Sequence, residues 1–168
     1  MQKIMTHLWF DTQAEEAARF YTSIFADSRI VEVVDLGKAA PDPDVSVQTV
    51  TFELAGQRYI ALNAGPEFTF SEAISLYVDC ADQEEVDYYW ARLLEGGGVE
   101  SQCGWLKDRY GLSWQIVPRR LSELMQDPDP ARAKRAMEAM FTMRKIEVPV
   151  LEAAADGTAE SGRADALG

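Results

Sequence analysis

The sequence predicts an α+β protein made of two similar βαβββ modules followed by a helical extension. The first observation behind this is an internal repeat, in which the strand–helix–strands pattern of residues 3–63 recurs in residues 73–118. The second is a change after Pro118, where strand-like alternation gives way to helical spacing. At 168 residues the chain is long enough for one well-packed core. The expected division is a single domain over residues 1–120, a helical extension over 121–155 and a flexible tail over 156–168.

The first module begins with a strand that places His7 and Trp9 on one face and Leu8 and Phe10 on the other. Thr12, with a glutamate three residues later, forms a capping-box pattern at the start of a helix. An apolar stripe at helical spacing follows, which predicts that one side of this helix packs on a sheet. The remaining expected strands are residues 30–36, 45–54 and 58–63, with a loop over 37–44.

The second module repeats this order of elements. A strand is expected over residues 73–79, and Asp82 caps a helix, again with a glutamate three residues later. The glycines at 96–98 follow that helix and end it. Residues 99–102 then start another strand.

A β-hairpin is predicted over residues 103–118, which read Cys-Gly-Trp-Leu-Lys-Asp-Arg-Tyr-Gly-Leu-Ser-Trp-Gln-Ile-Val-Pro. Asp108 opens the turn through its side chain, and Gly111 supplies the positive φ that such turns need. In the second arm Leu112, Trp114 and Ile116 suit a core covered by a helix. Ser113, Gln115 and Val117 point the other way, toward a cleft.

The extension is expected to hold a short helix over residues 121–126 and a longer one over 130–145. The longer helix starts at Asp129-Pro130, and its apolar stripe is rich in methionine. We assign this stripe to core or dimer packing and expect a homodimer. Residues 146–155 are expected to form a further short element, with Pro149 in the first turn of a helix.

The composition narrows the possible partners and location. With 28 acidic and 16 basic residues the net charge is −12, which disfavours nucleic acid and anionic membranes as partners. No run of apolar residues is long enough to span a membrane, and residues 1–4 lack the pattern of a signal peptide. Two cysteines, Cys80 and Cys103, suit reduced thiols in the cytoplasm. His7 is the one histidine, so a structural zinc site is not expected.

Several stretches resemble the PhnB-like family of the vicinal oxygen chelate (glyoxalase, bleomycin-resistance protein and dioxygenase) superfamily, whose members are often labelled 3-demethylubiquinone-9 3-methyltransferase. The likeness runs from residue 3 to about residue 152, and its most specific motif is the hairpin 103–118. The other motifs are His7-Leu8-Trp9-Phe10-Asp11 with Ala14-Glu15-Glu16-Ala17, Phe20-Tyr21 before Ile24-Phe25, Ala61-Leu62-Asn63 before Gly65-Pro66, Phe70-Ser71-Glu72-Ala73-Ile74-Ser75, and Val86-Asp87 with Tyr89-Trp90.

The resemblance implies a fold of paired βαβββ modules, and in enzymes of the superfamily it implies a divalent metal held by His and Glu side chains. Carried over to this chain, the four ligand positions fall on His7, on Ala61, at or beside Ala73, and on Gln115. Alanine has no donor atom, so we expect a cleft without a metal and without a cofactor. If a metal is bound, the expected ligands are His7, Gln115 and Glu72.

The predicted activity is small-molecule binding in an aromatic cleft. The expected ligand-binding residues are His7, Trp9, Tyr59, Asn63, Tyr77, Trp105 and Gln115. One alternative is a divalent-metal enzyme of the lyase, isomerase or dioxygenase type. The other is the methyltransferase of the family label, disfavoured because the first strand leads into a helix without the glycine-rich loop that a sulfonium cofactor usually needs. The sequence indicates no catalytic residue, and whether the protein is an enzyme stays open.

Overall fold

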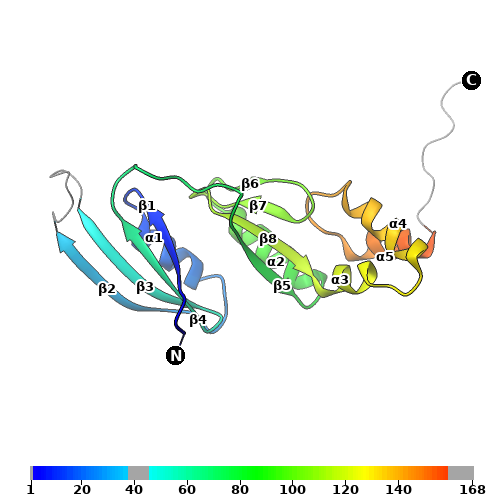
Figure 1. Cartoon of the computed structure of the whole chain (residues 1–168), viewed down its shortest axis with the longest axis horizontal. Coiled ribbons are helices and arrows are strands. Elements are labelled where there is room, and N and C mark those ends of the chain that lie inside the picture. Colours follow the sequence, from blue (N-terminus) through cyan, green and yellow to red (C-terminus); the bar gives the residue numbers. More distant parts are fainter. Residues whose placement is uncertain (1, 38–45, 159–168) are drawn as a thin grey trace, which may run out of the picture. The chain divides into compact units, whose positions relative to one another are not determined.

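The computed structural model describes residues 2–37 and 46–158 (Figure 1). The chain divides into two compact units, Met1–Ser71 and Glu72–Gly168. Most of the loop expected over 37–44 and most of the tail expected over 156–168 lie outside the described residues.

The first unit is a four-stranded sheet with one helix against it. Its strands lie in the order β1-β4-β3-β2, with β1 parallel to β4 and the other neighbours antiparallel. The elements are β1 (Thr6–Phe10), α1 (Ala14–Thr22), β2 (Arg29–Gly37), β3 (Val47–Leu54) and β4 (Gln57–Asn63).

The core of this unit lies between α1 and one face of the sheet. Tyr21 of α1 and Phe52 of β3 are fully buried, and Tyr59 of β4 stacks on Phe52 with ring centroids 5.5 Å apart. Ring pairs of this kind add about 0.5–1.5 kcal/mol to the hydrophobic gain of burial. The alternation seen in the sequence therefore describes a sheet with one covered face.

The predicted cap of α1 is wrong. Thr12 is not the N-cap, because the helix begins one residue later and its N-cap, Gln13, makes no side-chain capping bond. Asn63 supplies the missing acceptor from β4, since its Oδ1 accepts a hydrogen bond of 2.7 Å from the backbone N–H of Ala14. A tertiary contact thus does what the local capping pattern was expected to do.

The second unit repeats the same βαβββ order. Asp82 caps its helix as predicted, accepting a bond from the N–H of Glu85, whose carboxylate in turn accepts from the N–H of Ala81. The α+β class with paired modules is confirmed. The elements are β5 (Ser75–Cys80), α2 (Gln83–Leu94), β6 (Val99–Glu100), β7 (Trp105–Lys107) and β8 (Ser113–Pro118), with strand order β5-β8-β7-β6.

The predicted hairpin is formed by β7 and β8, and its turn is held from within by Asp108. One carboxylate oxygen of this buried residue accepts from the N–H groups of Tyr110 and Leu112, and the other accepts from the indole Nε1 of Trp114 at 2.8 Å. Gly111 has φ of 85°, as the turn pattern required. Asp108 therefore ties the turn to an aromatic residue of the core.

The extension contains three helices, α3 (Arg119–Met125), α4 (Pro130–Met140) and α5 (Val148–Asp156). The longer helix ends at Met140, five residues before the predicted end. A separate hydrophobic cluster holds the three helices together, formed by Val117, Leu121, Leu124, Ala136, Met143, Ile146, Leu151 and Ala155. No helix in the described part of the chain has the length and apolar character needed to cross a membrane.

Candidate functional site

Three of the predicted ligand-binding residues lie side by side on one face of the second sheet. Tyr77 of β5 is the register partner of Gln115 in the parallel pair β5–β8. Trp105 of β7 is the register partner of the same Gln115 in the antiparallel pair β7–β8. Directly paired residues share a face of the sheet, so the three side chains form a row with Gln115 in the middle.

Gln115 is fixed by a neighbour that the sequence did not single out. Its Nε2 donates a hydrogen bond of 2.8 Å to the hydroxyl of Ser75. An amide side chain has two donors and one acceptor oxygen. No residue in the described ranges donates to Gln115 Oε1, so this oxygen is available to accept a bond from a ligand.

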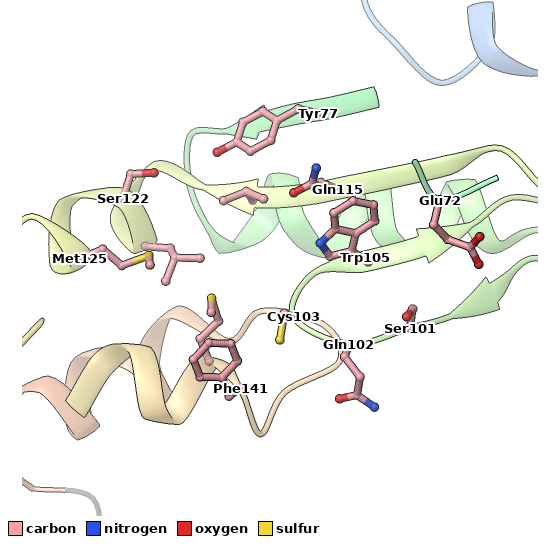
Figure 2. A pocket seen from close by; sticks show the side chains of 13 residues that line it. Glu72, Tyr77, Ser101, Gln102, Cys103, Trp105, Gln115, Ser122, Met125 and Phe141 are labelled. Carbon is pink, nitrogen blue, oxygen red and sulfur yellow. The ribbon is translucent and has the colours of Figure 1, made fainter. Parts of the chain in front are cut away.

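This row forms one wall of a cavity of about 710 Å³ (Figure 2). The opposite wall comes from the extension: α3 contributes Met125, α4 contributes Met140, and Phe141 follows α4 directly. The volume falls within the range of pockets that bind small molecules, which are commonly lined by apolar and aromatic side chains with few polar groups. Sequence reasoning missed this second wall, although the Met-rich stripe was the signal for it.

Glu72 is the charged residue among those that line the cavity, and it forms an ion pair with Lys107 of β7. The hydrogen bond from Lys107 holds the pKa of the Glu72 carboxyl below its ordinary value. A smaller cavity of about 210 Å³ adjoins the first, since both are lined by Glu72, Ser101 and Trp105. Ser113 lines the smaller cavity, and its buried hydroxyl has no hydrogen-bond partner.

The two cysteines differ in their surroundings. Cys103 lines the large cavity and has φ of 57°, a conformation that residues with a side chain adopt infrequently. Its backbone N–H donates to the carbonyl of Met143 at 2.8 Å, which holds the loop in place. Cys80 is fully buried, and burial raises the pKa of its thiol to about 12. A thiol with that pKa stays protonated near pH 7 and does not act as a nucleophile.

His7 and Trp9 lie in the first unit, on the face of its sheet opposite α1. Their register partners in β4 are Ile60 and Leu62. His7 is exposed. Trp9 donates from its indole Nε1 to the carbonyl of Gly65 at 2.8 Å and packs edge-on against Phe68 with ring centroids 4.9 Å apart. Both residues lie on the face opposite Leu8 and Phe10, as the alternation predicted, and their role in ligand binding stays a prediction.

Tyr59 was expected to line the same cleft as Trp9, and this is wrong; Asn63, also expected to bind the ligand, lies on the helix side with it. Tyr59 packs on Phe52 in the core under α1, and Asn63 caps α1. Ala61, between them in the alternation, is also fully buried on the helix side. Burial in the hydrophobic core raises the pKa of the Tyr59 hydroxyl. Asn63 also lines a polar hollow of about 320 Å³, together with Asp11, Thr12, Asp35, Ser46, Gln48 and Gly65.

The alternative metal site is not assembled within either unit. His7 belongs to the first unit, whereas Gln115 and Glu72 belong to the second. In the described ranges no three His, Cys, Asp or Glu side chains come together in a way that could hold a metal ion. The family resemblance put the third ligand position at or beside Ala73, but β5 begins at Ser75, and Ser75 is the residue that bonds to Gln115.

Comparison with known proteins identifies a family and solved structures that share the fold. A protein-family profile described as 3-demethylubiquinone-9 3-methyltransferase matches residues 2–117. The PhnB protein of Bacillus cereus is 36% identical, with a TM-score of 0.61, over 70% of this chain and 99% of its own. Protein PA1353 of Pseudomonas aeruginosa shares the fold at 16% identity and a TM-score of 0.57, over 70% of this chain and 98% of its own. No curated protein sequence matches.

The two βαβββ units, each with a four-stranded mixed sheet, thus define a protein of the vicinal oxygen chelate fold class. The chain belongs to the family described as 3-demethylubiquinone-9 3-methyltransferase, and its resemblance to PhnB-like proteins is confirmed.

Proposed function

We propose that the protein is a small-molecule binding protein whose ligand lies in the 710 Å³ cavity of the second unit. The observation that carries this is the row formed by Tyr77, Gln115 and Trp105 on one wall. Two aromatic side chains provide flat apolar surface, and the amide between them provides directional hydrogen bonding. Tyr77 is 53% exposed, so its ring has surface left for a ligand to cover.

The chemistry of the walls defines the class of ligand. The charge of Glu72 is compensated by Lys107, so nothing in the cavity favours a charged group. The free oxygen of Gln115 accepts hydrogen bonds, so the ligand carries a donor such as a hydroxyl or N–H group. We therefore propose a largely apolar, planar and uncharged ligand with one hydrogen-bond donor facing Gln115.

Binding is preferred here over the methyl transfer that the family description names. The chain passes from β1 to α1 through Asp11-Thr12-Gln13, without a glycine-rich loop for a sulfonium cofactor. Two measurements separate the alternatives. Addition of S-adenosylmethionine should leave the thermal unfolding temperature unchanged. Metal analysis of the purified protein should find no stoichiometric, chelator-sensitive ion, and finding one would favour a metal enzyme.

We also propose a cytoplasmic homodimer. Edge strand β2 exposes Val31, Val33 and Leu36, and exposed apolar edges of this kind support pairing with a second copy. Both cysteines are free thiols, which suits a reducing compartment. Light scattering tests the assembly: twice the chain mass is expected, and a sharp monomer mass would contradict it.

The binding proposal is tested with 2-naphthol, an uncharged planar molecule with one hydroxyl. Equilibrium dialysis should show saturable binding to the wild-type protein. Trp105→Ala should weaken this binding about tenfold, because the variant loses the aromatic wall. Tyr88→Ala is the matched control, since Tyr88 is an exposed aromatic residue of α2 outside the cavity. No saturable binding to the wild type, or equal loss in both variants, would contradict the proposal.

A further inference from the structure

The likeness to the family was expected to reach about residue 152, but the matched part of the chain ends near residue 117, so the helical extension lies outside it. The family profile ends at residue 117, and the Bacillus cereus relative is matched over 99% of its own length by 70% of this chain. Helices α3, α4 and α5 all follow this part, since the first of them begins at Arg119. The wall that they contribute to the cavity is therefore an addition to the shared fold.

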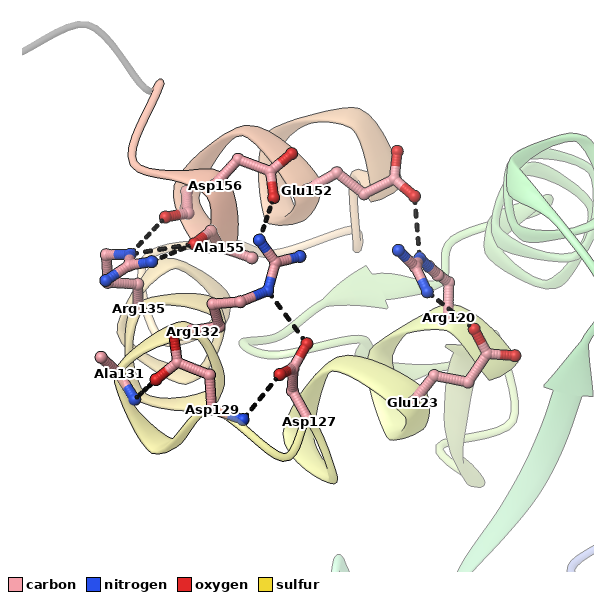
Figure 3. A network of polar contacts seen from close by, with 11 residues as sticks. Arg120, Glu123, Asp127, Asp129, Ala131, Arg132, Arg135, Glu152, Ala155 and Asp156 are labelled. Atoms are coloured by element: carbon pink, nitrogen blue, oxygen red, sulfur yellow. Dashed lines mark hydrogen bonds and ion pairs between the residues drawn. The ribbon is translucent and has the colours of Figure 1, made fainter.

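The extension has its own network of polar contacts (Figure 3) in addition to its hydrophobic cluster. Arg120 of α3 bonds to Glu152 of α5 at 2.8 Å. Arg132 of α4 bonds to Asp127 at 3.0 Å and also to Asp156 of α5. Arg135 donates to the carbonyl of Ala155 at the end of α5, where a cation suits the helix dipole. Figure 3 shows these arginines joining the three helices to one another.

The extension is also fixed to the sheet that carries the row of ligand-binding residues. The N–H groups of Cys103 and Gly104 donate to the carbonyls of Met143 and Arg144 at 2.8 and 2.7 Å. A Cβ atom at Gly104 would lie 2.9 Å from the carbonyl oxygen of Ile116 in β8 and 3.1 Å from the side chain of Ile146 in the extension, so glycine permits the close approach of both. The N–H of Val148 donates to Gln83 of α2 at 2.7 Å. Hydrogen bonds therefore join the two parts of the chain that line the cavity.

Two large apolar side chains of the extension line the cavity while remaining open to solvent. Phe141 is 62% exposed and Met125 is 39% exposed. The hydrophobic cluster of the extension is complete without them. Figure 2 shows both in the wall facing Tyr77 and Trp105. Of the residues that the extension adds to this wall, none is charged.

We propose that the helical extension is the specificity element of the cavity: Met125 and Phe141 hold the hydrocarbon part of the ligand and select against charged molecules. This rests on the binding proposed above and assigns its selectivity to residues that the shared fold lacks. The side chain of methionine is flexible and polarizable, so Met125 and Met140 adapt to ligands of different shape.

Dialysis with 2-naphthol and its anionic counterpart 2-naphthoate tests this proposal. Phe141→Ser and Met125→Ser should each weaken 2-naphthol binding about tenfold, since each removes apolar contact area. The matched controls are Val150→Ser and Met137→Ser, because these residues of the extension are 51% and 37% exposed but lie outside the cavity. Both controls should bind as the wild type does.

A variant that gains binding is also needed, because the serine variants could bind more weakly through loss of folding. Met125→Lys should raise the affinity for 2-naphthoate relative to 2-naphthol by about tenfold, through a new ion pair in the wall. Met137→Lys should leave that ratio unchanged.

The outcomes separate this proposal from the binding proposal. If Trp105→Ala loses binding but the Phe141 and Met125 variants match their controls, the cavity binds the ligand but the extension does not select it. If Phe141→Ser lowers the particle mass measured by light scattering and leaves 2-naphthol binding intact, Phe141 belongs to a subunit interface and the proposal is overturned. Absence of 2-naphthol binding to the wild type contradicts both proposals.

Discussion

Gln115 donates a 2.8 Å hydrogen bond to the hydroxyl of Ser75 across the parallel strands β5 and β8. This contact commits one N–H of the Gln115 amide to the protein and leaves the carbonyl oxygen to accept a bond from a ligand. The orientation of the side chain, and hence the donor required of the ligand, depends on Ser75. Ser75 is therefore a positioning residue, although it was absent from the residues predicted to bind the ligand.

Ser75→Ala should release the amide of Gln115 without unfolding the sheet. We expect the side-chain N–H signals of Gln115 in the NMR spectrum to broaden or shift as the amide begins to rotate, and the affinity for 2-naphthol to fall about threefold to tenfold. Ser122→Ala, in another part of the cavity wall, is the control. Unchanged Gln115 signals in the Ser75 variant would show that the bond does not orient the amide.

Ser113→Ala should stabilise the protein or leave its stability unchanged. The Ser113 side chain is 1% exposed, and its hydroxyl has no hydrogen-bond partner. A buried polar group without a partner costs about 1–3 kcal/mol, so removing it should raise the free energy of unfolding by about 1 kcal/mol. Urea unfolding provides the measurement. A decrease of 1 kcal/mol or more would mean that the hydroxyl makes a stabilising contact.

Asn63→Ala should destabilise the protein by about 2 kcal/mol, because it removes a buried acceptor from the first turn of α1. Thr12→Ala is the informative control, since Thr12 holds the position that the sequence pattern assigned to the cap. It should change the free energy of unfolding by less than about 0.5 kcal/mol. A larger loss of stability in Thr12→Ala than in Asn63→Ala would show that Thr12, and not Asn63, caps the helix.

The role of Asn63 illustrates where sequence reasoning reached its limit. Local patterns correctly predicted the cap at Asp82 and the turn at Asp108, because in both cases the partners are a few residues apart. Asn63 lies 49 residues from Ala14, and no local pattern signals that bond. The same limit applies to Tyr59, because its face was assigned without knowing which side of β4 the helix covers.

The fold itself was predictable because its evidence is repeated along the chain. Two copies of the strand–helix–strands pattern, together with the hairpin motif, indicated paired βαβββ modules. Alternation in β7 and β8 also placed Trp105 and Gln115 on one face. The second wall of the cavity was missed because the Met-rich stripe was assigned to core or dimer packing, and because Met125 and Phe141 reach the wall only through the packing of the extension.

The ion pair between Asp87 of α2 and Lys145 gives a test of how the extension is fixed. The hydrogen bond from Lys145, with a second from Gln83, holds the pKa of the Asp87 carboxyl below its ordinary value of 3.8. A carboxyl whose pKa is lower in the folded state stabilises it above the unfolded pKa, and this contribution is lost as the pH falls through the folded pKa. Lys145→Met should move the Asp87 pKa back toward 3.8.

An NMR titration of the Asp87 side-chain carboxyl in the two proteins measures this shift. Lys134→Met serves as the control, because Lys134 pairs with Glu138 within α4 and has no contact with Asp87. Identical titration of Asp87 in the wild type and in Lys145→Met would show that the ion pair does not form in solution.

Gln115 is expected to select uncharged ligands that carry a hydrogen-bond donor in the cavity of the second unit. The direct measurement is equilibrium dialysis of 2-naphthol and 2-methylnaphthalene, which differ by a hydroxyl in place of a methyl group, against the wild type and Gln115→Leu. We predict that the wild type prefers 2-naphthol about tenfold and that Gln115→Leu loses this preference while still binding 2-methylnaphthalene. An equal preference for 2-naphthol in both proteins would contradict the account.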